Sequence, residues 1–341
     1  ETGGQTLSMF GYGDGGSGVT EEMLELMERF EKLSIMTKTE HMRADEFLHR
    51  NLKDNGQLEI WDGELYLEMH RGTFTTKSNL KAYNRRLEFK LRTAEILSVL
   101  RMKEGKAYPK EELKACYKML LLNQFHDILP GSHINPVYQD ALKDYQELES
   151  RLDTLIGESG EVYWNTLNQK REELVFIPSE DGPVLRKGIR GYFAPADMDA
   201  FSSKKFRRSV DSSTSWLMVE GMKVETPRYK ILFNENGSID SLFDKKAKRE
   251  WADGKLNQMH LYQDTPGMYD AWDILPNYKD VEYPLTVSEG LHMTYVDGIL
   301  AEFTVAVKTP GEKSTWKMVI RLFKDSPEIE VENIVDWDEK H

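Results

Sequence analysis

Three stretches of helix-periodic apolar residues between positions 75 and 158 constrain the fold of this chain more than any other feature. In each stretch the apolar side chains recur at every third or fourth position, so they lie on one face of an α-helix. The links between the stretches are short, which favours an antiparallel three-helix bundle. Pro109 and Pro136 stand where the first turn of a helix tolerates proline. The stripes consist of Leu80, Tyr83, Leu87, Leu91, Ala94 and Leu97; of Leu113, Cys116, Tyr117 and Leu120; and of Val137, Ala141, Tyr145, Leu148, Leu152 and Leu155.

The residues before this region alternate between helical and strand-like patterns. A helix is expected at 20–34, where Thr20 can cap the first turn, and a second helix at 45–52. Short strands are expected at 35–39 and 58–68. This alternation indicates part of a parallel α/β sheet or barrel.

Residues 159–341 change character again, because Gly, Pro, Ser and Asp punctuate short strand-like runs. The segment 229–243 predicts a hairpin with Asn236-Gly237 at its turn. We expect a large antiparallel β-sandwich that is incomplete at residue 341, and therefore a multidomain α+β chain. Further strands are predicted at 303–307, 316–323 and 329–335.

Charge and composition exclude several classes of protein. The chain has 45 Lys and Arg against 58 Asp and Glu, a formal net charge of −13, which disfavours nucleic acid as a partner. No run approaches the roughly 18 apolar residues of a membrane helix, so no membrane association is expected. Cys116 is the single cysteine, which rules out a disulfide within the chain and a cysteine-based zinc site. It also favours a reducing compartment, the cytoplasm.

A glycine-rich segment at 10–18 surrounds Asp14, and its glycines allow the backbone to approach a ligand closely. A phosphate loop is excluded because no Lys-Ser or Lys-Thr pair follows and because a central carboxylate repels phosphate. One interpretation is a catalytic carboxylate at the carboxyl end of a barrel strand. The alternative is a flexible loop in which the aspartate forms a turn.

A second segment, 123–132, places His126 and Asp127 at the end of an apolar helix, just before a Pro-Gly stop. An imidazole together with carboxylates from elsewhere in the chain suits zinc. The alternative is that His126 caps the last carbonyls of the helix.

A third segment, 61–76, combines acidic, aromatic and basic side chains. Its Trp and Tyr offer flat faces to sugar rings, and Arg71 can hold hydroxyls or a carboxylate. The alternative is a half-buried strand with solvated charges.

Together these segments resemble the α-mannosidases of glycoside hydrolase family 38, in its bacterial and cytosolic branch. The resemblance covers the chain from end to end, and its motifs occur in the order of the family. They are the segments 11–16, 61–76, 123–132, 264–273 and 337–341.

The resemblance implies the architecture and the chemistry of that family. Residues 1–74 would be the C-terminal part of the α/β catalytic barrel, 75–158 a three-helix bundle middle domain, and 159–341 an incomplete β-sandwich domain. The family consists of retaining glycosidases, in which one carboxylate attacks the anomeric carbon and another protonates the leaving oxygen. A zinc ion in the sugar subsite holds hydroxyls of the mannose ring.

The resemblance also assigns residues. His126 matches the zinc-binding histidine, Asp127 the neighbouring carboxylate that contacts the sugar, and Asp14 the acid/base, while Arg71 is expected to bind substrate. The family's His-x-Asp pair has no counterpart in this sequence, and its nucleophilic aspartate is not matched either. Ser17 and Val19 stand where the family usually has Gly and Pro. We therefore expect a fragment that holds one zinc ligand and is inactive alone.

Two alternatives remain open. One is a mannosylglycerate hydrolase of the same family, which would share every motif. The other is a non-catalytic carbohydrate-binding or scaffold fragment that uses Trp216, Trp251 and Trp272 as platforms. The expected ligand is an α-mannoside or a mannose-containing oligosaccharide, in mannose metabolism or glycan degradation.

A partial barrel has an unpaired rim of strand edges. We therefore expect the residues before 75 to be less ordered than the bundle, or to be shielded in a homo-oligomer.

Overall fold

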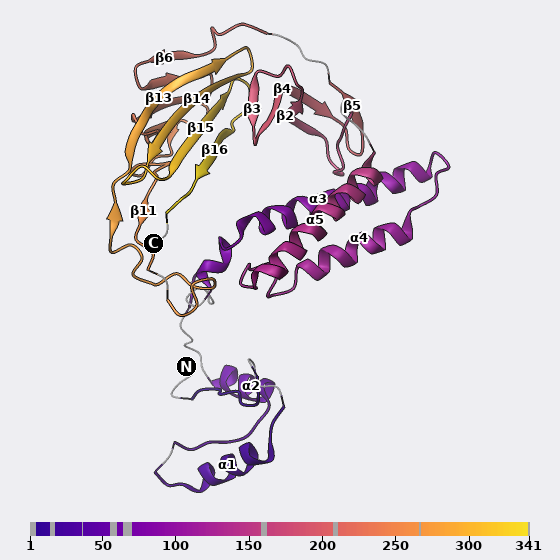
Figure 1. Cartoon of the computed structure of the whole chain (residues 1–341), viewed down its shortest axis with the longest axis vertical. Coiled ribbons are helices and arrows are strands. Elements are labelled where there is room, and N and C mark those ends of the chain that lie inside the picture. The colour runs from indigo at the N-terminus through magenta and orange to yellow at the C-terminus, as the bar shows by residue number, and fades with distance from the viewer. Residues whose placement is uncertain are drawn as a thin grey trace. The chain divides into compact units, whose positions relative to one another are not determined.

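Helices occupy the first half of the chain and antiparallel sheets the second half in the computed structural model (Figure 1). The structure describes residues 5–13, 18–35, 37–54, 60–63, 70–157, 162–206, 211–265 and 267–339. The mixed α+β prediction is confirmed. The chain forms two compact units, residues 1–65 and 66–341. Within the described ranges, no helix has both the length and the apolar character needed to cross a lipid bilayer.

The helices are α1 (Glu21–Lys32), α2 (Ala44–Asp54), the 3-10 helix η1 (Arg71–Phe74), α3 (Ser78–Met102), α4 (Lys110–Asn123) and α5 (Asn135–Ile156). The strands are β1 (Val162–Trp164), β2 (Arg171–Pro178), β3 (Val184–Arg186), β4 (Ile189–Met198), β5 (Ser203–Lys205), β6 (Met218–Glu220), β7 (Lys223–Glu225), β8 (Tyr229–Phe233), β9 (Ile239–Asp244), β10 (Arg249–Glu250), β11 (Leu261–Tyr262), β12 (Glu282–Tyr283), β13 (Thr286–Val296), β14 (Leu300–Lys308), β15 (Thr315–Phe323) and β16 (Ile329–Asp336).

The first unit contains the two expected helices, α1 and α2. The Oγ1 atom of Thr20 accepts a hydrogen bond from the backbone N–H of Met23 at 3.3 Å and so caps α1. The strand expected at 35–39 is wrong, because the described residues of that range are not in a strand. A short apolar run becomes a strand only where a neighbouring strand takes up its backbone hydrogen bonds. The strand expected at 58–68 lies mostly outside the described residues.

Helices α3, α4 and α5 pack around one shared core. Most of the side chains predicted to form apolar stripes are buried in this core, whereas Tyr117 on α4 is exposed. Tyr83 of α3 stacks on Tyr145 of α5 with 5.7 Å between the ring centroids. The buried members are Leu80, Leu87, Leu91, Ala94, Leu113, Cys116, Leu120, Ala141, Tyr145, Leu148 and Leu152.

Ion pairs along one edge join α3 to α5. The guanidinium of Arg86 binds both carboxylate oxygens of Glu149, at 2.9 and 3.1 Å, and Lys90 binds the same carboxylate at 2.8 Å. Burial alone would raise the pKa of Glu149, but the hydrogen bonds from Arg86 and Lys90 hold it below its ordinary value. The pairing fixes the register of the two helices beside their apolar contact.

Two antiparallel sheets of the second unit share a core. One has the strand order β10-β9-β8-β7-β6 and the other β13-β14-β15-β16. The predicted hairpin at 229–243 is confirmed as β8 and β9, and Gly237 adopts the left-handed φ of +81° that its turn requires. A third sheet, β2-β4-β3, and the strand pairs β1-β5 and β11-β12 complete this part. The shared core contains Val224, Ile231, Phe233, Ile239, Ala301, Phe303, Val305, Met318, Ile320 and Leu322.

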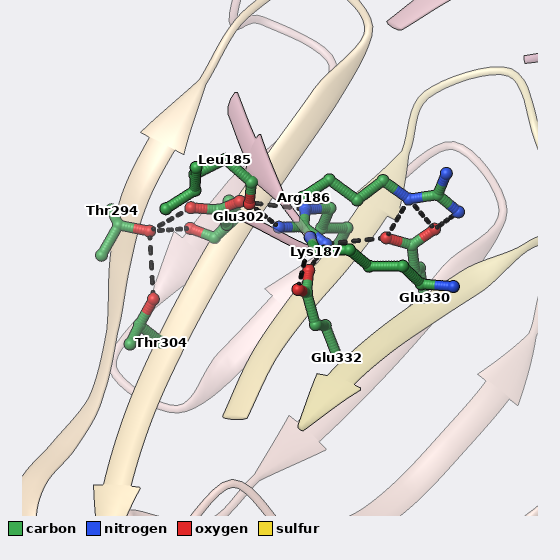
Figure 2. A network of polar contacts seen from close by, with 9 residues as sticks. Leu185, Arg186, Lys187, Thr294, Glu302, Thr304, Glu330 and Glu332 are labelled. Carbon is green, nitrogen blue, oxygen red and sulfur yellow. Dashed lines mark hydrogen bonds and ion pairs between the residues drawn. The ribbon is translucent and has the colours of Figure 1, made fainter. Parts of the chain in front are cut away.

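A network of hydrogen bonds and ion pairs joins β3 to the four-stranded sheet, and Figure 2 shows Leu185, Glu302, Glu330 and Glu332 as members of it. Arg321 is fully buried and donates to Glu302 at 3.0 Å and to Glu330 and Glu332 at 2.7 Å each. Its remaining nitrogen donates to the carbonyl of Leu185 on β3 at 2.7 Å. Burial lowers the pKa of Arg321, but hydrogen bonds to the glutamates outweigh it and raise the pKa above its ordinary value. Arg321 is therefore charged, and its donors bind three strands and β3 together.

We expect the helical core to lose stability at alkaline pH because of Tyr145. Burial, with the nearby carboxylates Glu88 and Asp144, raises the pKa of Tyr145 from 10.0 to about 12. Between these two values the unfolded chain loses the phenolic proton and the folded chain keeps it, so stability falls as the pH rises. The loss approaches roughly 3 kcal/mol. We expect Tyr145→Phe to abolish this part of the pH dependence in urea unfolding measured at about pH 9 and about pH 11.5. Equal pH dependence of the two proteins in that window would contradict the assignment.

Candidate functional site

Three segments that are far apart in the sequence meet in the second unit. The backbone N–H of Gly72 donates to the carbonyl of Trp272 at 2.9 Å, and the hydroxyl of Thr76 donates to the carbonyl of Ala271 at 2.8 Å. Gly131 lies against Thr76. Residues 70–76 thus meet the described parts of the motifs 123–132 and 264–273 where η1 leads into α3.

Two glycines make this convergence possible. A Cβ atom on Gly131, which has a φ of +86°, would lie 2.4 Å from the carbonyl oxygen of Thr76. A Cβ atom on Gly72 would lie 3.0 Å from backbone atoms of Trp272 and Asp273. Since backbone atoms cannot give way as a flexible side chain can, close approach requires glycine at both positions.

Polar side chains hold the end of α4 where the second motif begins. Asn123 is buried and its Nδ2 atom donates to Asp144 of α5 at 3.1 Å. The Nε2 atom of Gln124 donates to Asn84 at 3.0 Å and to Glu88 at 2.9 Å, both on α3. The start of the loop is therefore fixed to both neighbouring helices.

His126 and Asp127 lie on the surface of this loop. Their side chains are 78% and 55% exposed, and His126 Nε2 is 3.6 Å from Asp127 Oδ2. The ring of Phe125 packs on the imidazole with 4.2 Å between centroids. Among the described residues His126 donates to no backbone carbonyl, so the helix-capping interpretation is not supported. Both side chains are available to a ligand from outside the loop.

Arg71 lies at the start of η1 and is half-buried. Within the described ranges its guanidinium has no carboxylate or carbonyl partner, so it can bind a ligand. Asp14 lies outside the described residues.

The described residues do not form a complete metal site. In these parts of the chain no group of three or more His, Cys, Asp and Glu side chains could hold a metal ion. His126 and Asp127 supply one imidazole and one carboxylate, whereas a protein zinc site has three or four protein ligands. The donor set fits part of a zinc site and needs further ligands.

Of the three candidate platform tryptophans, Trp272 belongs to one of the converging motifs, 264–273. Its ring stacks with that of Tyr269, at 6.1 Å between centroids, and with that of His70, at 5.7 Å. Trp216 instead donates through its Nε1 atom to the carbonyl of Asp297 and packs on the sheet core. Trp251 lies in the second half of the chain under the guanidinium of Arg249, which is 4.3 Å from the ring centroid.

The sequence interpretation missed the side chains of α3 that support the loop. Asn84 is a buried polar residue one helical turn after Leu80, in the middle of the apolar stripe. Glu88 follows one turn later. A polar pair that interrupts a stripe in this way is a signal for a partner on a neighbouring element.

Comparison with known domain families gives two matches. The family described as "Alpha mannosidase middle domain" matches residues 68–162. The family described as "Glycosyl hydrolases family 38 C-terminal domain" matches residues 224–341.

Curated proteins similar to this chain carry related names. "Alpha-mannosidase 2C1" of Mus musculus is 29% identical and aligns with 98% of this chain and 34% of its own length. "Alpha-mannosidase G" of Dictyostelium discoideum is 25% identical, over 99% of this chain and 37% of its own length. "Alpha-mannosidase" of Saccharomyces cerevisiae is 29% identical, over 83% of this chain and 27% of its own length. The chain thus spans roughly a third of these relatives.

A solved structure has a similar fold. The crystal structure of an α-mannosidase from Enterococcus faecalis V583 matches with a TM-score of 0.54 and 14% identity, over 94% of this chain and 49% of that one.

The close approach at Gly131 can be tested against a matched glycine. Gly105 also has a left-handed φ, +81°, but a Cβ atom there would have no neighbour within 4 Å. We expect Gly131→Ala to lower the free energy of unfolding by about 1–3 kcal/mol more than Gly105→Ala, because only the former collides with backbone. Chemical denaturation of both variants measures the difference. Equal losses would show that Gly131 is needed for its φ angle alone.

Proposed function

We propose that this chain, which belongs to glycoside hydrolase family 38, is part of an α-mannosidase that hydrolyses the O-glycosidic bonds of α-mannosides. The observation that carries the proposal is the match to the family's middle and C-terminal domains in order along one chain. The names of the curated relatives support it. Because the chain spans only part of their length, the activity of the whole protein belongs to the proposal.

The proposal includes the arrangement of domains. Residues 1–74 would complete an α/β catalytic barrel, 75–158 would be a three-helix bundle, and 159–341 would be part of a β-sandwich domain. The core shared by α3, α4 and α5 supports the second assignment. The two sheets with a common core support the third.

The proposed chemistry is that of a retaining glycosidase. Asp14 would protonate the leaving oxygen in the first step and remove a proton from water in the second. Arg71 and Asp127 would bind sugar hydroxyls, since both are free to contact a ligand. The nucleophile would be the family's second catalytic carboxylate, which has no counterpart among the matched motifs of this sequence.

His126 would be the zinc ligand that this chain contributes. The exposure of its imidazole and the adjacent carboxylate of Asp127 support this role. A bound zinc ion would supply charge that holds ring hydroxyls. The further ligands would come from outside the described residues.

We also infer that the protein acts in the cytoplasm, in mannose metabolism or glycan degradation. The single cysteine, Cys116, is buried in the helical core, and a chain with one cysteine forms no internal disulfide.

The role of Asp14 can be tested in the full-length enzyme by varying the leaving group. An alkyl leaving group needs a proton, whereas a dinitrophenyl group leaves without one. We expect Asp14→Asn to lower kcat/KM about 10²–10⁴-fold on an alkyl α-mannoside and far less on the dinitrophenyl substrate. Asp240→Asn, at an exposed position of β9, is the control and should keep wild-type rates.

Wild-type rates of the Asp14→Asn variant on both substrates would exclude Asp14 as the acid. Turnover of mannosylglycerate but not of aryl mannosides by the wild type would favour the alternative hydrolase.

The 341-residue chain alone should not hydrolyse mannosides. A retaining mechanism holds two carboxylates about 5–5.5 Å apart, and the matched motifs supply one of them. We expect no turnover of an activated aryl α-mannoside in excess zinc, with less than one zinc bound per chain by elemental analysis. Turnover at the rate of an ordinary glycosidase with stoichiometric zinc would contradict this.

A further inference from the structure

Lys81 donates three hydrogen bonds to backbone carbonyls at the convergence of the motifs. Its Nζ atom lies 2.6 Å from the oxygen of Thr76, and 3.0 Å from those of Leu129 and Pro130. An ammonium group has three protons, so its capacity as a donor is fully used. Two acceptors belong to the loop that carries His126 and Asp127. The third, the carbonyl of Thr76, lies at the end of the segment that begins at Arg71.

The position of Lys81 is unfavourable for a cation in three respects. It lies in the first turn of α3, where the helix dipole is positive and where no acidic residue compensates. It is half-buried, and burial lowers the pKa of its ammonium group. In the described parts of the chain no carboxylate forms an ion pair with it. Each of these features disfavours a charged ammonium group at this position. The hydrogen bonds to the three carbonyls offset that unfavourable free energy.

We propose that Lys81 is a positioning residue of this site: it fixes the loop of His126 and Asp127 against the segment of Arg71. Among the described residues Lys81 has no hydrogen bond or ion pair to these side chains, so it acts through the backbone on either side. The role toward substrate rests on the function proposed above, but the role in holding the two segments does not.

The contact reaches the third segment through Thr76. While the carbonyl of Thr76 accepts from Lys81, the Oγ1 atom of Thr76 lies 2.8 Å from the carbonyl oxygens of both Gly72 and Ala271, which share its one proton. On its other side the loop 124–131 is fixed by Asn123 and Gln124. Lys81 therefore supplies a hydrogen-bonded attachment between the loop and the segment of Arg71, and removal of its ammonium leaves the two segments without that attachment.

Hydrogen exchange of the 341-residue chain tests the attachment. In Lys81→Met, whose side chain has a similar length and no donor, we expect the amides of 71–76 and 124–131 to exchange on the order of tenfold faster. The amides of α5 should keep their protection. Lys118→Met, at an exposed lysine of α4, is the matched control and should exchange like the wild type. Unchanged exchange in both segments would overturn the proposal, as would an equal increase throughout α3, α4 and α5.

Kinetics of the full-length enzyme test the consequence for the site. We expect Lys81→Met to lower kcat/KM for an aryl α-mannoside about 100-fold, as a displaced catalytic loop does, while Lys118→Met stays active. Lys81→Arg keeps the charge, but a planar guanidinium cannot aim three donors at three converging oxygens, so it should not restore activity. Full activity of either Lys81 variant would overturn the positioning role. A wild-type enzyme without mannosidase activity would instead refute the proposed function, and the exchange result would still decide whether Lys81 holds the loop.

Discussion

The apolar core shared by α3, α4 and α5 is the contact on which the candidate site depends. The loop with His126 and Asp127 begins where α4 ends, and the segment with Arg71 leads directly into α3. Burial of one stripe from each helix sets the rotation of α3 and α4, and so decides which polar side chains face the loop. Gln124 can reach Asn84 and Glu88 only because these helices meet in that rotation. The site is thus a consequence of packing several turns away from it.

Helical periodicity predicted this core well, because one chain segment contains all the information about which face is apolar. The predicted hairpin at Asn236-Gly237 was equally local, since its turn needs a positive φ at one glycine. The strand expected at 35–39 failed for the opposite reason: a strand depends on a partner that the local pattern does not specify. Resemblance to a family drew attention to 61–76, 123–132 and 264–273, but not to their contact. Lys81 carried no signal at all, because its three acceptors are carbonyls, which every residue has.

The β part shows a similar limit of sequence patterns. Glu330 and Glu332 alternate with apolar residues along β16, a pattern that normally indicates a solvent-facing row of carboxylates. They instead converge on Arg321, which is fully buried opposite Glu302 and Glu330 in the sheet register. Arg186 adds a second guanidinium on Glu330. A buried ion network of this kind needs every partner, because an isolated charge in that position would be costly.

The hydrogen bond between Thr76 and Ala271 joins residues 195 positions apart, and this separation bears on the order in which the molecule forms. The contacts within α3–α5 and within the sheets join nearer neighbours in the chain, so they can form before so long a loop closes. Convergence of the motif segments should then be a late event in folding. A newly made chain would possess its helices and sheets for some time before the candidate site is assembled.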